Sequence, residues 1–192
     1  MYSLPTVIEI GGKEYTIRNQ GDYRMVLDCC VALSDEELED IERIFAALCI
    51  FYEDVNEVAD LSIFDDVKEA VTEMYNFLRC GEEESHTHSY KLIDWESDEQ
   101  LIASAINKVV GKEIRVEPYI HWWTFMGYYM AIGECPLSHI VSIRSKIVKG
   151  QKLEKHEKQF KRENPQYFSW DRRSLEQKEA EAWVASVWNS GA

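Results

Sequence analysis

The sequence predicts a mainly α-helical protein: an N-terminal β-hairpin, a compact bundle of about six helices, and a charged helical C-terminal extension. Through most of the 192 residues, apolar side chains recur every three or four positions, as on one face of an α-helix. Only the start of the chain alternates instead, around a Gly-Gly pair. With 45% hydrophobic residues, the chain can fill one core. We therefore expect the hairpin and helical core in residues 1–149 and the extension in residues 150–192.

The first elements are two short strands and a helix. Thr6–Ile10 and Glu14–Arg18 flank Gly11-Gly12, a pair typical of tight hairpin turns. Residues 21–31 then predict a short helix with four inward side chains: Tyr23, Val26, Leu27 and Cys30.

Two longer helices are predicted next. Ser34-Asp35-Glu36-Glu37 has the pattern of a capping box, in which Ser and Glu side chains satisfy free backbone N–H groups at a helix start. The helix that it would open has one apolar stripe, formed by Leu38, Ile41, Phe45, Leu48 and Tyr52. The helix after it ends near Gly81, and its stripe is Phe64, Val67, Val71, Met74 and Leu78.

The second half of the core also carries helix start and stop signals. Ser97-Asp98-Glu99-Gln100 is a second candidate capping box, and the helix after it should stop at Gly111. Pro118 suits the first position of a further helix. Because Ile120–Ile132 is apolar on nearly every side, we expect it to be the central buried helix.

The last core helix contains a cation on an apolar face. Gly133 and Pro136 separate it from the central helix, and its apolar positions are Leu137, Ile140, Val141, Ile143 and Ile147. Arg144 lies among them, and a buried guanidinium needs a carboxylate or carbonyl groups. We interpret Arg144 as a structural clamp, with Asp22 or Asp94 as its expected partner.

The densest aromatic group is His121-Trp122-Trp123-Thr124-Phe125. Adjacent indoles favour burial, and buried indole and imidazole groups need hydrogen-bond partners. We therefore expect Trp122, Trp123 and Phe125 to be buried, and His121 to be a hydrogen-bonded core histidine.

The sequence contains no recognisable catalytic motif. His86 and His88 lie in a polar loop without a second ligand pair at zinc-binding spacing. The five cysteines include no CxxC pair, which favours reduced thiols. We therefore expect no metal, no cofactor and no enzymatic activity.

The charge is unevenly distributed. The net charge is −14, and residues 35–84 contain seventeen acidic residues against Arg43, Lys68 and Arg79. In residues 144–173 the balance reverses, with ten Lys and Arg against four acidic residues. The acidic body argues against duplex nucleic acid as a partner. The basic segment fits either a solvated helix face or a contact with nucleic acid or an acidic protein. With no apolar stretch long enough to span a membrane and no signal-peptide pattern, we expect the protein in the cytoplasm.

The extension has too few apolar residues to form its own core. The apolar residues of 150–164 are only Leu153 and Phe160. Residues 174–188 predict one more helix, with a sparse apolar face. Tryptophan is a common interface anchor. We therefore predict that a partner binds the extension through Phe160, Trp170, Trp183 and Trp188. The acidic body and basic extension also favour head-to-tail self-association.

Several of these residues resemble the bacteriophage gene-product-fifteen family. The matching landmarks are Leu4-Pro5-Thr6, Gly12–Arg18, Asp22-Tyr23-Arg24, His121–Phe125 and Ile140–Arg144. The resemblance covers about residues 4–165 and departs at Tyr23, where the family usually has Phe, and in residues 174–192. It implies a structural core role for Arg24, His121, Trp122, Trp123, Phe125 and Arg144.

The resemblance also implies a function. The family is grouped with tail assembly chaperones of long-tailed phages and prophages of Gram-positive bacteria. Such a protein would bind the tape measure protein, contact tail tube subunits and support tail tube polymerisation. It would act in the cytoplasm of the infected or lysogenic host and be absent from the mature virion.

Two alternatives remain open at the level of sequence. The acidic helices could form a DNA-mimic inhibitor of a host protein, which needs carboxylates spaced like phosphates along one surface. However, the same helices carry strong core stripes, so much of this charge is ordinary outer surface. Another role in phage morphogenesis is the second alternative.

Overall fold

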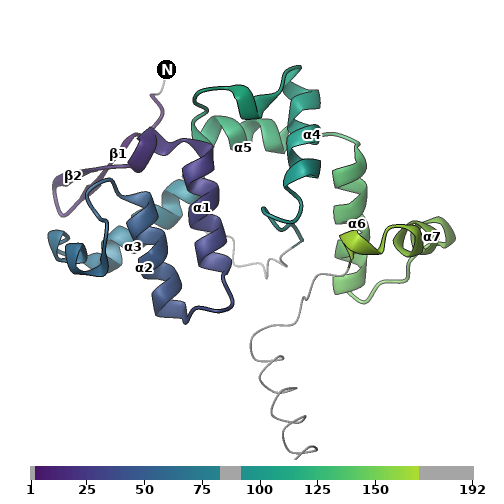
Figure 1. Cartoon of the computed structure of the whole chain (residues 1–192), viewed down its shortest axis with the longest axis horizontal. Coiled ribbons are helices and arrows are strands. Elements are labelled where there is room, and N and C mark those ends of the chain that lie inside the picture. Colours follow the sequence, from purple (N-terminus) through teal and green to yellow (C-terminus); the bar gives the residue numbers. More distant parts are fainter. Residues whose placement is uncertain (1–2, 83–91, 169–192) are drawn as a thin grey trace, which may run out of the picture. The chain divides into compact units, whose positions relative to one another are not determined.

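The computed structural model describes residues 3–82 and 92–168 (Figure 1). Within these residues a two-stranded hairpin precedes seven α-helices, which confirms the predicted fold class. Two compact units are present: residues 3–82 with 93–141, and Leu92 with residues 142–168. Compactness does not show separate folding, so the predicted division at residue 149 stays a prediction. In the described part of the chain, no helix is long and apolar enough to cross a membrane.

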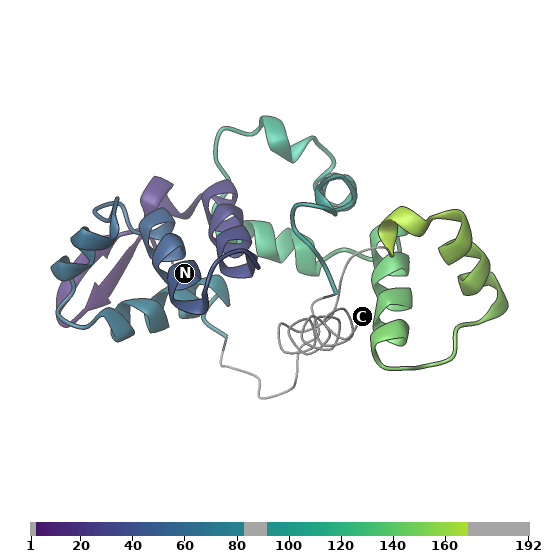
Figure 2. The ribbon, with the colours of Figure 1, turned by 60° about the horizontal axis from the view of Figure 1, so that its bottom comes forward.

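The hairpin is formed as predicted. Strands β1 (Val7–Ile10) and β2 (Lys13–Thr16) are antiparallel, with Ile8 opposite Tyr15. Gly11 and Gly12 both have positive φ, at 58° and 79°, which a tight hairpin turn requires. The buried face contains Ile8, Ile10 and Tyr15, and β1 packs against α3 (Val67–Leu78) (Figure 2).

A sharp turn joins the hairpin to α1 (Tyr23–Ser34). This turn is the 3-10 helix η1 (Arg18–Gly21), and its last residue has a φ of 76°. A Cβ atom on Gly21 would lie 2.8 Å from Phe77 Cζ, so both the backbone and the packing require glycine there.

Arg18 binds the end of a second helix, α2 (Asp40–Phe51). Its guanidinium donates to the carbonyl groups of Cys49, Ile50, Tyr52, Glu53 and Val55, at 2.9–3.3 Å. The first three of these carbonyls lie at the C-terminal end of α2, the negative end of the helix dipole, where a cation is stabilising. Arg18 therefore fixes the hairpin to α2.

The predicted capping box at Ser34 is wrong. Ser34 ends α1, and its hydroxyl donates to the Cys30 carbonyl at 2.8 Å instead of capping a new helix. The capping box of α2 uses Glu39 and Glu42, whose side chain accepts from Glu39 N at 2.9 Å. Ile41, expected on the buried stripe, is 63% exposed. The buried residues of α2 are Ala47, Leu48 and Phe51.

Helices α3 and α4 follow α2 along the chain. In α3 the Asp66 side chain caps the first turn, and Cys80 and Gly81 have positive φ after its end, as predicted near Gly81. Helix α4 (Glu99–Val110) ends at Gly111, also as predicted. Its predicted capping box is wrong, because the N-cap is Asp98 and not Ser97, and the buried Asp98 carboxylate accepts from Asp94 N in the preceding loop.

Helix α5 (Trp122–Met130) begins four residues after the predicted start at Pro118. After the 3-10 helix η3 (Ile114–Val116), the backbone at Ile120 and His121 pairs with the start of α1. Tyr23 N donates to Ile120 O at 2.9 Å, so this segment is held in an extended conformation. Helix α5 is also not buried on every side, since Met130 is 74% exposed.

His121 is buried and both ring nitrogens are used. Nδ1 accepts from Trp123 N at 3.1 Å and so caps α5, while Nε2 lies 2.9 Å from the Pro5 carbonyl oxygen. A carbonyl only accepts, so Nε2 carries the proton and the ring is neutral. This arrangement matches the expected core histidine.

The two tryptophans of α5 bind the end of α3. Trp122 is 2% exposed and its indole N–H donates to Leu78 O at 2.9 Å. Trp123 is half-buried and donates to Phe77 O at 3.0 Å. Phe125 is buried and stacks on Tyr23 of α1, with ring centroids 4.5 Å apart. The expected burial therefore holds for Trp122 and Phe125 and only in part for Trp123.

The second unit contains most of α6 (Pro136–Val148), α7 (Lys155–Glu163) and the 3-10 helix η4 (Pro165–Tyr167). Glu157 of α7 is 4% exposed and pairs with Lys146 of α6 at 2.6 Å. This ion pair, buried on the Glu157 side only, fixes α7 to α6. The predicted helix in residues 174–188 lies outside the described residues.

We predict that Trp122→Ala lowers the free energy of unfolding by about 3–5 kcal/mol, because a buried aromatic ring and its hydrogen bond are lost. Met130→Ala on the same helix should change it by less than about 0.5 kcal/mol, because Met130 is exposed. Urea unfolding monitored by circular dichroism measures both. Equal effects of the two substitutions would contradict the central position of Trp122.

We also predict a pH dependence from His121. Burial lowers its pKa, and the unfolded residue titrates near 6.5. The unfolded state therefore binds more protons just below this pH, so the stabilising effect of neutral His121 is complete above about pH 6.5 and is lost as the pH falls. His121→Asn keeps a capping acceptor without a titrating ring. Urea unfolding between about pH 7 and 5 should give a flatter stability curve for His121→Asn, and an unchanged slope would refute the assignment.

Candidate binding groove

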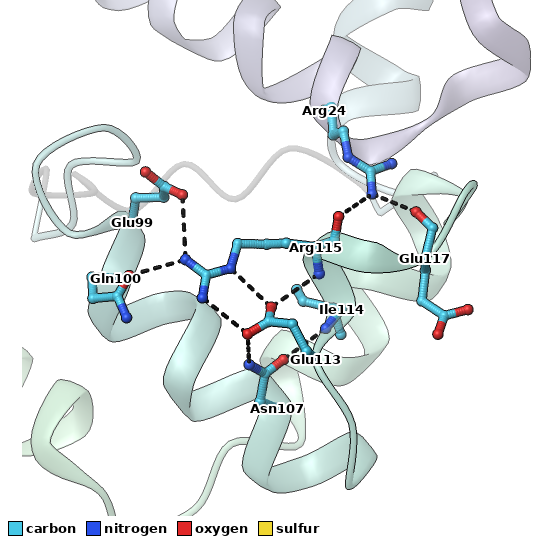
Figure 3. A network of polar contacts seen from close by, with 8 residues as sticks. All are labelled: Arg24, Glu99, Gln100, Asn107, Glu113, Ile114, Arg115 and Glu117. Carbon is cyan, nitrogen blue, oxygen red and sulfur yellow. Dashed lines mark hydrogen bonds and ion pairs between the residues drawn. The ribbon is translucent and has the colours of Figure 1, made fainter.

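Arg24 connects the start of α1 to the segment that follows α4 (Figure 3). Its guanidinium donates to both Asp22 carboxylate oxygens at 3.0 and 3.1 Å, and to the Glu117 carbonyl at 2.6 Å. A weaker contact reaches the Arg115 carbonyl at 3.3 Å. Arg24 also lies over the Tyr23 ring, 4.6 Å from its centroid. The positive charge of Arg24 is therefore already engaged.

A second arginine is held in the same way. Arg115 Nε and Nη2 donate to the two carboxylate oxygens of Glu113 at 2.8 and 2.9 Å, and Nη1 donates to Gln100 of α4 (Figure 3). The Asn107 side chain also donates to Glu113 and accepts from Ile114 N. The Arg115 hydrogen bonds hold the pKa of Glu113 at about 2. This network fixes η3 against α4.

An apolar groove of about 250 Å³ lies beside this network, within the first unit. Side chains from α1, α4, α5 and η3 form it, and the apolar ones include Tyr23, Leu27, Trp95, Ile102, Ile114 and Phe125. Arg24, Arg115, Glu99 and Asp28 supply its charged groups. An apolar cleft with few polar groups around it is the usual form of a binding site for a side chain or small molecule.

Asp28 differs from the other charged groups of the groove. The Arg24 and Arg115 cations are neutralised by carboxylates, whereas Asp28 makes no hydrogen bond or ion pair with any residue that the structure describes. Asp28 is exposed, and partial desolvation by the surrounding protein raises the pKa of its carboxyl. Arg24 and Asp28 also border a second, wider hollow of about 910 Å³. Asp28 therefore provides an unpaired negative charge where two hollows of the surface meet.

The second unit presents a basic outer surface. Lys155, Lys158, Lys161 and Arg162 of α7 are exposed. Phe160, a predicted partner-binding residue, is half-buried and packs edge-to-face on Phe168, with centroids 6.3 Å apart. Its role in binding stays a prediction. The other three predicted anchors, Trp170, Trp183 and Trp188, lie outside the described residues.

The structure also places the residues predicted to be structural. Arg144 is 2% exposed and donates to the carbonyls of Tyr167 at 2.9 Å and Leu92 at 3.1 Å, as a clamp within the second unit. Asp22, one of its two expected partners, accepts from Arg24 and from Ile120 N. Within residues 3–82 and 92–168, no three His, Cys, Asp or Glu side chains gather to hold a metal ion. His86 and His88 lie outside this part of the chain.

The groove itself was not predicted from the sequence. Its charged partners Glu113 and Arg115 are two residues apart, a spacing that helical patterns do not single out. Trp95 lies in the loop before α4, where no apolar period includes it. Of its lining residues, Tyr23, Arg24 and Phe125 belong to the family landmarks, and Leu27 is predicted as an inward side chain of the first helix.

Comparison with known proteins identifies the family. A family model described as Bacteriophage Gp15 protein matches residues 1–169. No curated protein and no solved structure matches the chain. The matched region includes every landmark noted in the sequence, and it indicates a phage structural or morphogenesis protein. The chain therefore belongs to the Bacteriophage Gp15 protein family.

Proposed function

We propose that this protein is a phage tail assembly chaperone that binds the tape measure protein and supports tail tube polymerisation. The observation that carries the proposal is an apolar groove with a charged rim, on an acidic chain of a bacteriophage family. A chaperone must cover apolar surface of its client and remain soluble itself. The groove serves the first requirement and the net charge of −14 serves the second.

The groove suits one face of a client helix. An amphipathic helix binds by placing apolar side chains at positions i, i+3, i+4 and i+7 into an apolar cleft. The groove volume of about 250 Å³ accommodates one large side chain. Leu27 of α1 forms part of its lining. One groove therefore holds one anchor residue, and several copies are needed to cover a long client.

The proposed function also includes the partners of the protein and the place where it acts. The protein acts by binding and not by catalysis, with the tape measure protein as its client and tail tube subunits as a second contact. It acts in the host cytoplasm during assembly and is absent from the finished virion. Mass spectrometry of purified virions and of infected-cell lysate tests this last point directly.

We predict that Leu27→Glu reduces co-purification of the tape measure protein of the same phage by about tenfold or more, because a charge is placed in the apolar groove. Val31→Glu is the matched control. It adds the same charge one turn further along α1, at a residue that is 39% exposed and does not line the groove. Co-expression followed by affinity purification and quantitative blotting measures the ratio of client to chaperone.

Both variants must first show the melting temperature of the wild-type chain. Equal client recovery with Leu27→Glu and Val31→Glu would exclude the groove as the client site. No tape measure protein bound to the wild-type chain would contradict the chaperone proposal as a whole.

A further inference from the structure

The charged groups around the groove of the first unit narrow the choice of ligand further than its apolar lining does. Its two arginines are satisfied by Asp22 and Glu113, so neither is available to an incoming anion. Asp28 has no partner among the described residues. Glu99 makes only a long ion pair with Arg115, with 3.9 Å between the Glu99 carboxylate oxygen and the guanidinium nitrogen. The charge left for a ligand is therefore negative. A matching ligand combines a large apolar side chain with a nearby cation.

The chain itself contains such a combination. In residues 169–192, Trp170 is followed by Asp171, Arg172 and Arg173, so the segment Trp170–Arg173 has a net positive charge. The other two tryptophans of this segment have no such neighbours, since Trp183 follows Glu181 and Ala182. Within residues 150–168, the aromatic residue next to cations is Phe160, which is already packed on Phe168. Trp170–Arg173 is therefore the segment with the best chemical match to the groove.

We propose that the groove of one copy binds the Trp170–Arg173 segment of a second copy, so that self-association and client binding compete for one site. Trp170 occupies the apolar groove, and Arg172 or Arg173 pairs with Asp28. The wider hollow that shares Asp28 leaves space for the residues on either side of the anchor.

This inference rests on the proposed function in one respect: the groove is also the client site. A copy whose groove holds client cannot also hold the segment of a neighbour, so the contact between copies forms among client-free molecules. A contact between a groove and a terminal segment is heterologous, so it can repeat along a row of molecules. Before assembly, the same contact would cover the apolar groove and protect it from unspecific binding.

A charge-swap experiment on the full-length chain tests the contact. Asp28→Arg alone and the double variant Arg172→Asp/Arg173→Asp alone each place like charges together, so each should raise the dissociation constant of self-association by roughly tenfold or more. Mixing the two variants restores opposite charges in both directions, because each groove then meets a complementary segment. Sedimentation velocity over a concentration series measures the association. We expect the mixture to recover association close to that of the wild-type chain.

Matched controls separate this contact from general charge effects. Trp170→Ala should weaken self-association as Asp28→Arg does, whereas Trp183→Ala and Lys178→Asp should leave it within about twofold of the wild type. Raising the salt concentration should weaken association of the wild-type chain. A wild-type chain that stays monomeric at every concentration, or a mixture that fails to recover association, would overturn the inference. A loss caused by Trp183→Ala instead of Trp170→Ala would also overturn it.

The outcome is distinguishable from that of the proposed function. Self-association is measured without any client. A wild-type chain that does not self-associate would therefore overturn this inference and leave the proposed client binding untouched. Trp170→Ala leaves the groove intact and should retain or increase client recovery. Leu27→Glu should reduce both self-association and client recovery. Self-association that survives Leu27→Glu would show that the groove is not the contact.

Discussion

The backbone bridge between Asp22 and His121 is the interaction on which the first unit depends. Asp22 caps α1 and also accepts from Ile120 N at 3.0 Å, while His121 caps α5. Two helix starts are thereby placed side by side, and each supplies groups that the other needs. Buried N–H groups at a helix start are costly when unpaired, so the bridge orients α1 and α5 together. The stacking of Tyr23 on Phe125 follows directly from this geometry.

The groove is a consequence of the same junction. Arg24, two residues after Asp22, reaches the carbonyls of Arg115 and Glu117 and so holds the segment between α4 and α5 near α1. The Arg115–Glu113 pair then fixes that segment to α4. The cations around the groove thus serve the fold, which leaves Asp28 as the charged group with no structural partner among the described residues. The proposed preference of the groove for a cationic ligand depends on this unpaired carboxylate.

Local sequence patterns predicted the fold class and several helix ends. Contacts between residues distant in sequence determine the start of α5 and the groove. The hairpin, the stop at Gly111 and the start at Pro136 depend on backbone preferences of single residues. Ser34 and Ser97 fit the capping pattern, but the Ser34 hydroxyl donates to the Cys30 carbonyl of the preceding turn, and α4 begins after Asp98 instead. Helix α5 starts late because Ile120 pairs with residues almost one hundred positions earlier. The groove could not be predicted either, because four separate segments contribute to it.

The distance in sequence between Asp22 and Ile120 also has a consequence for synthesis on the ribosome. Their hydrogen bond spans 98 residues, and at about 5–20 residues per second roughly 5–20 s of translation separate the two. Until Ile120 has emerged, α1 lacks the partner of its first turn, and the groove lacks Phe125 and Arg115. The groove therefore cannot form in a nascent copy before Phe125 has emerged from the ribosome. The earliest time at which the proposed ligand site exists is thus set by the order of translation.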